Sequence, residues 1–180
     1  MTNDEDRTDF IFAMLGLATP QAMMRAYERD HYKEQDEKPI SDKIRLLTGL
    51  RRYRIQWING IALHYKLSTR AVKKDKIESI ANTITSNLSS IIQNLPQECQ
   101  EALKICFDNG GWVKYSKISR LYGNEGQDGF FWEKTPPTSV IGVLRHRGLV
   151  FIGKLGIDGR NHQVIVIPSD LRKQVGLILA

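Results

Sequence analysis

The side chains that most often carry catalysis or hold metal ions are few in this chain. The four histidines, His31, His64, His146 and His162, form no HExxH or HxH motif, and no cysteine lies at metal-ligand spacing from them. Neither a GxxxxGKS/T nor a GxGxxG phosphate-binding motif occurs. The sequence therefore predicts a protein that is not an enzyme and that uses no metal and no cofactor.

The two cysteines, Cys99 and Cys106, lie seven residues apart in a segment that is expected to be helical. Two helical turns separate them by roughly 10 Å, which is too far for a disulfide. Because no further ligand accompanies them, a metal site is not expected either. We expect both to be small apolar residues on one helix face.

Basic side chains are the stronger candidates for chemistry, because lysine and arginine neutralise the phosphates of nucleic acids. The net charge of +6 is unevenly distributed. Residues 1–40 carry 5 basic and 9 acidic side chains (−4), residues 41–94 carry 10 and 3 (+7), and residues 95–180 carry 11 and 8 (+3). The basic middle favours a polyanion such as double-stranded DNA, although many basic proteins never bind nucleic acid.

No membrane span is expected, because the apolar runs are far shorter than the roughly 20 residues of a spanning helix. The first nine residues carry four acidic side chains and one arginine, the opposite of a secretory signal, and include the charge run 4–6, which we expect to be frayed. We therefore expect a folded protein of the cytoplasm.

An acidic helical arm is expected over residues 1–40. Thr19 and Pro20 resemble the N-cap and the first position of a helix, and an apolar stripe follows over residues 22–27. The charged run 28–38 is expected to end ordered structure. Residues 34–39, which close with Pro39, are predicted to be a linker.

A basic helical region is expected over residues 41–94, beginning with a helix that Ser41 caps. Arg51, Arg52 and Arg54 lie on the predicted solvent side of this helix and are candidate phosphate contacts. The alternative is a solvated face whose arginine methylenes pack against the core. Residues 87–95 continue the helical spacing, either as a connecting helix or as the interface of a homodimer.

A helix, a turn and a second helix are predicted over residues 55–85. The turn and its flanks are basic, through Lys66, Arg70, Lys73, Lys74 and Lys76. The LST turn followed by KDKIESIANTI resembles the SAP-type and Rho-N-terminal-like helix-extended-helix modules. That resemblance implies nucleic-acid binding, with Arg70, Lys73 and Lys74 as contacts; the alternative is a plain helical bundle with a solvated basic edge.

The order of elements after Leu95 is the most informative part of the sequence. We expect a helix over residues 97–109, a short strand over 112–115, a second helix from Ser116 to Gly123, and a third helix over 140–146. Two strands, 149–157 and 161–167, are joined through Asp158 and Gly159, a strong hairpin signal. A last helix follows from Pro168.

This succession resembles the winged-helix family over residues 96–175. The resemblance implies that the helix beginning near Thr138 enters the major groove of DNA and that the hairpin, the wing, contacts the backbone or the minor groove. Thr138, Gly142 and Arg145 are expected on the solvent side of that helix. The implied DNA contacts are Thr138, Ser139, Gly142, Arg145 and His146 on the helix, Lys154, Arg160 and His162 on the wing, and Lys114, Lys117 and Arg120 before them.

One departure from the family weakens base reading. The predicted reading helix begins with Pro136-Pro137-Thr138-Ser139 instead of the Arg, Asn or Gln that make bidentate base contacts. The expected function is therefore DNA binding of modest specificity, as in a transcriptional regulator. The alternative is an adaptor that binds a protein partner. The aromatic cluster 130–132 is expected to cover the core, or else to stack on bases.

The expected fold is mainly α with a small β-hairpin, an α+β protein. Its expected parts are the acidic arm and linker (1–40), the basic helical region (41–94) and a winged-helix domain (95–180).

Overall fold

The computed structural model describes residues 15, 16 and 18–180, so the charge run 4–6 lies outside the described residues. The fold is mainly α with one small antiparallel sheet, which confirms the predicted class. The elements are α2 (Pro20–Asp36), α3 (Leu46–Arg52), α4 (Ile55–His64), α5 (Lys73–Gln93), α6 (Gln97–Asp108), β1 (Trp112–Lys114), α7 (Tyr115–Tyr122), α8 (Val140–His146), β2 (Phe151–Ile157), β3 (Arg160–Val166) and α9 (Arg172–Leu179).

From α6 onward the elements follow the predicted order with small shifts at their ends. The strands are arranged β1-β3-β2, and Ile165 on β3 is paired with both Val113 and Ile152. Asp158 and Gly159 both take positive φ, 49° and 76°, as a two-residue hairpin turn requires. The local turn chemistry therefore sets the register of the hairpin.

The prediction of a linker over residues 34–39 is wrong. Helix α2 continues through the charged run to Asp36, because most of its charged side chains are exposed while Gln35 is buried and the Asp36 carboxylate pairs with Arg145. Beyond the helix, Ile40 donates its N–H to the carbonyl of Lys154, and Lys154 donates to the carbonyl of Lys38. These two backbone hydrogen bonds fix the segment against β2.

The next helix begins later than predicted, at Leu46 instead of just after Ser41. The Ser41 hydroxyl accepts from the N–H of Lys43 in a local turn, and the Asp170 carboxylate accepts from the N–H of Leu46 at 2.9 Å. Asp170 lies 124 residues away in sequence, so local spacing could not indicate this cap.

The predicted helix pair of residues 55–85 is present as α4 and α5. Helix α5 also takes up most of the predicted segment 87–95, with a non-helical residue at Asn87. The basic turn is the connection between the two helices.

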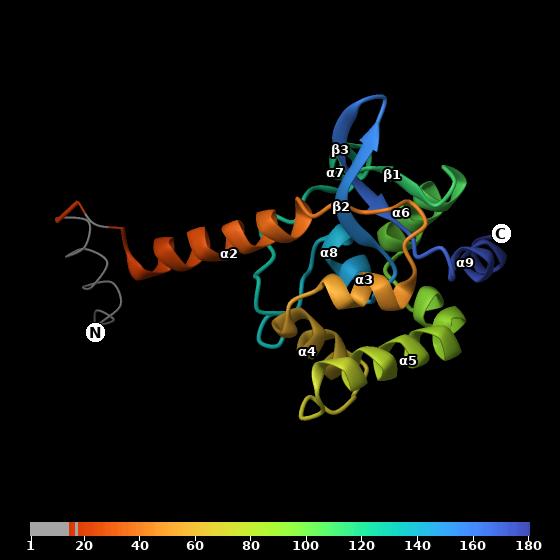
Figure 1. Cartoon of the computed structure of the whole chain (residues 1–180), viewed down its shortest axis with the longest axis horizontal. Helices are drawn as coiled ribbons and strands as arrows, with labels where there is room; N and C mark the ends of the chain where they lie inside the picture. Colours follow the sequence, from red (N-terminus) through yellow and green to blue (C-terminus); the bar gives the residue numbers. More distant parts are fainter. Residues whose placement is uncertain (1–14, 17) are drawn as a thin grey trace.

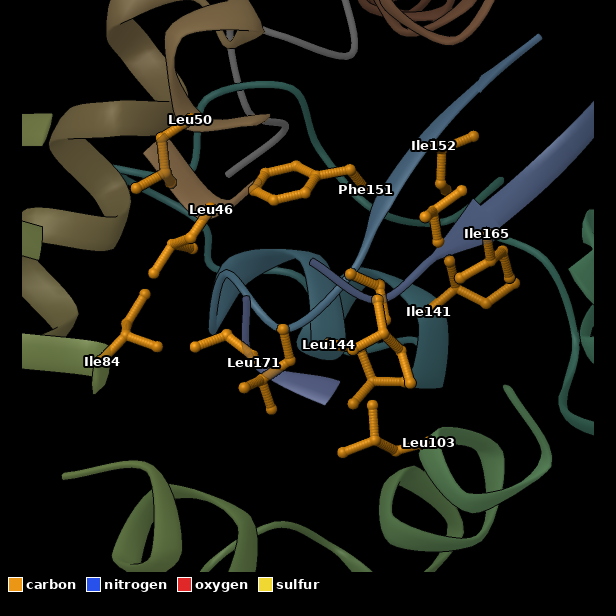
Figure 2. Packing of buried hydrophobic residues seen from close by; sticks show 14 of the residues in the cluster. Leu46, Leu50, Ile84, Leu103, Ile141, Leu144, Phe151, Ile152, Ile165 and Leu171 are labelled. Carbon is orange, nitrogen blue, oxygen red and sulfur yellow. The ribbon is translucent and has the colours of Figure 1, made fainter. Parts of the chain in front are cut away.

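One hydrophobic core joins the helices of residues 41–94 to those of 95–180. Leu46, Leu50 and Ile84 meet Leu144 and Phe151 in a single cluster, which Figure 2 shows from close by. The boundary predicted near residue 95 therefore does not separate two cores. Helix α2 projects from this body, and the β2–β3 hairpin projects in another direction (Figure 1).

Candidate functional site

Helix α8 is the predicted reading helix, and local chemistry fixes its beginning. The Ser139 hydroxyl accepts from the N–H of Gly142 at 3.0 Å, as in an ordinary N-cap. The Asp128 carboxylate in turn accepts from the N–H groups of Thr138 and Ser139, at 2.9 and 3.1 Å. Asp128 thereby attaches the preceding loop to the start of the helix.

The predicted solvent side of α8 is buried at Gly142 and Arg145, so this expectation is wrong for these two residues, and His146, an implied DNA contact, is buried as well. The exposed fraction of Arg145 is 0% and that of His146 is 3%. A Cβ atom at Gly142 would lie 2.7 Å from Pro137, so the loop before the helix fills the space at this position. Of the predicted readers at this helix, Thr138 is exposed and Ser139 is half-buried but bound to Asp128.

Arg145 is enclosed by two carboxylates and an aromatic ring. Its guanidinium donates to both oxygens of Glu125, at 2.9 and 3.0 Å, and to Asp36 at 2.8 Å. The guanidinium carbon lies 4.6 Å from the ring centre of Trp57, within cation–π range. The side chain that looked like a base reader is thus the centre of a buried ion cluster.

This cluster holds two carboxylates for one guanidinium, so it carries an excess negative charge when all three are ionised. Burial raises the pKa of Glu125 to about 7, although the nearby Arg145 opposes that shift. Burial also raises the pKa of Asp36, again against the attraction of Arg145. Protonation of one carboxyl group would remove the excess charge.

Aromatic residues from the loop before α8 complete the cover. Trp132 is stacked on Trp57 with ring centres 4.2 Å apart, and the Trp57 indole N–H donates to the carbonyl of Phe130 at 2.8 Å. Phe130 and Trp132 are buried, which confirms the expected core cover for these two residues. Phe131 is half-buried and faces Tyr27 of α2 in a stacked arrangement.

A groove of about 840 Å³ lies between α2 and the loop 124–129, with Gln163 of β3 on its wall. Its charged lining residues are Arg25, Glu28, Arg29, Asp36, Glu125 and Asp128. Asp36 and Glu125 are paired with buried Arg145, and the other lining charges are two arginines and two carboxylates, so this side of α8 offers no net positive charge to the phosphates of DNA.

The predicted wing residues lie on opposite faces of the hairpin. Side chains alternate along a strand, and the register places Lys114, His162 and Arg160 on one face of the sheet. Lys154 pairs with Gln163 on the other face, where the Gln163 amide donates to Asp36 at 3.2 Å. We call Lys114, Arg160 and His162 the basic sheet face.

The residues of the basic sheet face are accessible. Arg160 and Lys114 are exposed and His162 is half-buried. Lys117 and Arg120 are exposed on α7, which follows β1 directly, and the Lys117 ammonium donates to Asn109 at 3.1 Å. The structure therefore brings three predicted contacts onto one face of the sheet, with two more on the next helix.

Of the predicted DNA contacts in the basic helical region, residues 41–94, three bind other parts of the protein and the other three are exposed. Arg52 donates to the carbonyls of Lys38 and Pro39, Arg54 pairs with Glu34, and the Lys73 ammonium donates to the carbonyl of Tyr53. The remaining three, Arg51, Arg70 and Lys74, are exposed. The hairpin and the α4–α5 connection lie at opposite sides of the body in Figure 1, so they do not form one patch.

Sequence reasoning missed Asp36 and Glu125, the two partners of Arg145. They lie 109 and 20 residues from it along the chain. Each stands in a polar stretch that looks solvent-exposed, so no local signal could identify them. An arginine within an otherwise apolar helix was the available hint, because a buried charge requires a partner.

Within residues 15, 16 and 18–180, no three histidine, cysteine, aspartate or glutamate side chains are placed to hold a metal ion. Over the same residues, no helix has the length and apolar character to cross a bilayer. Cys99 and Cys106 are both buried and unbridged. Comparison with protein-family models, characterised proteins and solved structures finds no match for this chain.

Proposed function

We propose that this protein binds double-stranded DNA through its phosphate backbone, with the basic sheet face and α7 as the contact surface. The observation that carries the proposal is the common face of Lys114, Arg160 and His162, with Lys117 and Arg120 exposed on the adjacent helix. Each cation that meets a phosphate releases condensed counterions from the DNA, which favours binding.

Helix α8 serves as scaffold in this proposal and not as a reading helix. Its outer side is covered by the loop 124–139, and the groove beside it offers no net positive charge. Phosphate contacts position a protein on DNA without reading its sequence. The binding is therefore of low sequence specificity, as expected of a non-enzymatic DNA-binding protein or an accessory subunit of a regulator.

The order of helices and strands from α6 to β3 supports a winged-helix likeness, in which the hairpin is the wing. Exposed Arg70 and Lys74 lie on the helix pair α4–α5, whose sequence resembles helix-extended-helix modules, and this resemblance favours a role in nucleic-acid binding. In our proposal the helix pair is a second contact, separate from the basic sheet face, because it lies on a different side of the body from the hairpin (Figure 1).

Fluorescence anisotropy with a labelled random-sequence duplex tests the proposal. The logarithm of the binding constant falls linearly with the logarithm of the salt concentration, with a slope of about −0.9 for each phosphate contact. Unlabelled duplex of unrelated sequence competes fully. An absence of binding at low salt would rule the proposal out.

Single substitutions locate the surface. Arg160→Ala and Lys114→Ala each reduce the magnitude of the salt slope by about one and weaken binding at every salt concentration tested. Lys104→Ala, which removes an exposed charge from α6, is the matched control and leaves both quantities unchanged. If only Arg70→Ala and Lys74→Ala weaken binding, the helix pair and not the sheet face is the contact surface.

A protein-binding adaptor is the alternative, and the exposed side chains of α2 favour it. Met23, Met24 and Tyr27 are 61%, 52% and 49% exposed on a helix that projects from the body. Large apolar side chains at such positions are typical of protein contacts. Absence of salt-dependent DNA binding, together with a partner whose binding is lost in Met23→Ser, would replace the DNA proposal with this one.

A further inference from the structure

A second cavity, of about 310 Å³, lies beside the C-terminal end of α8. We call it the α8-end cavity. Its volume is near the lower end of the roughly 300–1,000 Å³ of ligand pockets. Apolar side chains form most of its wall, and its lining consists of Gly60, Leu63, His64, Trp132, Glu133, Pro136, Pro137, Val143, His146 and Arg147.

His146 brings an unused hydrogen-bonding atom to this cavity. The residue is 3% exposed, and its Nε2 atom is buried with no hydrogen-bond partner of ordinary geometry among the described residues, although burial lowers the pKa of the ring and a backbone contact with Gly60 opposes this shift. The other ring nitrogen, Nδ1, lies 3.3 Å from the Arg147 guanidinium. A guanidinium can only donate, so Nδ1 accepts and the neutral ring carries its hydrogen on Nε2. A buried donor of this kind is costly unless an acceptor reaches it.

Arg147 supplies a positive charge beside this donor. Its guanidinium is half-buried, and among residues 15, 16 and 18–180 no carboxylate lies within ion-pair distance of it. Burial lowers the pKa of Arg147 and lowers the pKa of His146 to about 4, so the ring is neutral at pH 7 while the guanidinium keeps its charge. The pair offers one cation and one neutral N–H donor.

The hydrogen-bond acceptors near the cavity already accept hydrogen bonds from other groups of the protein. The last carbonyls of α8 accept from the N–H groups of Gly148 and Leu149, at 2.9 and 3.0 Å. Glu133 stands exposed at the rim and accepts from the Asn59 amide at 2.6 Å. Glu133 keeps its negative charge, but it is exposed to solvent that screens it, so an anion placed beside His146 and Arg147 meets the donors of these two residues.

We propose that the α8-end cavity binds a small aromatic carboxylic acid, with its carboxylate against Arg147 and the Nε2–H of His146. The ring of the ligand lies among Leu63, Val143 and the two prolines of the wall. This site does not depend on DNA binding, since it lies on the α4 side of α8 and shares no residue with the basic sheet face.

Isothermal titration calorimetry with the full chain tests the site directly. The probes are benzoate, phenylacetate and 3-phenylpropionate, each compared with the alcohol and the amine of the same carbon skeleton. At least one acid binds ten times more tightly than its alcohol, and the amines bind no better than the alcohols. Equal binding of acid and alcohol, or no binding of any acid at millimolar concentration, overturns the proposal.

Substitution of the cation provides a second test. Arg147→Gln weakens binding of the acid at least tenfold and leaves binding of the alcohol unchanged, whereas Arg147→Lys restores part of the affinity. Arg51→Gln, which removes an exposed arginine on α3, is the matched control. Equal affinity of the wild-type protein and Arg147→Gln for the acid overturns the assignment, and the comparison of acid with alcohol stands even if the variant does not fold.

The same chemistry could come from the end of a polypeptide, so acetyl-glycyl-phenylalanine is titrated in parallel. The small volume of the cavity favours a free acid, and we expect the peptide to bind at least fivefold more weakly. Tighter binding of the peptide would overturn the assignment to a free acid.

Discussion

Helix α8 and the β2–β3 hairpin were both expected to present basic side chains to DNA. In the structure, the arginine of α8 is buried and the arginine of the hairpin is exposed. Arg145 of α8 is 0% exposed and bound by two carboxylates, while Arg160 at the hairpin turn is exposed. The two arginines look alike in sequence. The difference teaches that an arginine within an apolar helix signals a buried partner at least as readily as a ligand contact.

Replacement of each arginine by methionine should give the largest difference in stability between the two regions. Arg145→Met keeps the length of the side chain but leaves Glu125 and Asp36 buried without their cation, and we expect a loss of about 3–5 kcal/mol in the free energy of unfolding at pH 7. Arg160→Met, the control, should change it by less than about 0.5 kcal/mol. Urea denaturation measures both, and equal effects would contradict the buried ion cluster.

The pH dependence of stability should come from the cluster and not from the hairpin. Glu125 has a folded-state pKa of about 7 against an ordinary value of 4.5, so the folded protein holds the extra proton between these values. Its contribution to stability therefore grows as the pH falls from about 7 to about 4.5, by as much as about 3 kcal/mol at ~1.4 kcal/mol per pKa unit.

The histidines His64 and His146 act in the opposite direction. Burial lowers the pKa of each to about 4, so they destabilise the folded state as the pH falls below 6.5. The informative quantity is thus the difference between the wild-type protein and Glu125→Gln, measured by urea denaturation at several pH values. A difference that stays constant from pH 7 to 4.5 would exclude the assignment to Glu125.

Two glycines offer a smaller and more local comparison. Gly142→Ala places a methyl group against Pro137 and Asp128, which are fixed by the cap of α8, and should destabilise the protein by about 1–3 kcal/mol despite the better helix propensity of alanine. Gly156→Ala on the hairpin meets only Asn161 at 3.8 Å and should be nearly neutral. Thermal unfolding measures the loss of stability in each variant. A Gly142→Ala variant as stable as the wild-type protein would mean that the loop does not pack tightly against α8.

Local sequence signals predicted the part of the fold from α6 to β3 well. Glycine pairs, the Asp158-Gly159 turn and the apolar periodicities act over a few residues, and the structure places the elements close to the expected bounds. The burial of α8 could not be predicted in this way. Its cover comes from Asp36 of α2, from Trp57 of α4 and from the loop before it. The contacts of Arg145 with Asp36 and Trp57 join residues distant in sequence, while Asp128 of the loop contacts Thr138 from ten residues away.

The sequence pattern could not show which of the predicted basic contacts share one surface. The alternation of strand side chains follows from the register, and it separates Lys154 from Arg160 and His162. In the middle of the chain, Arg52 and Lys73 donate to backbone carbonyls. A count of charges in the sequence cannot show whether a basic side chain binds the protein itself or faces solvent. A count of charges therefore overestimated the cations that are free to meet a phosphate.

The hydrogen bonds between Lys154 and the segment of Lys38 and Ile40 have a consequence for self-association. A sheet with an open outer strand can recruit the same strand of another molecule and start aggregation. Here the segment before α3 occupies the backbone of β2 at Lys154, and the strand at the other border, β1, is only three residues long. At its base the small sheet thus offers little template for intermolecular β-pairing, whereas residues 160–163 of β3, nearer the hairpin turn, pair only with β2 among the described residues.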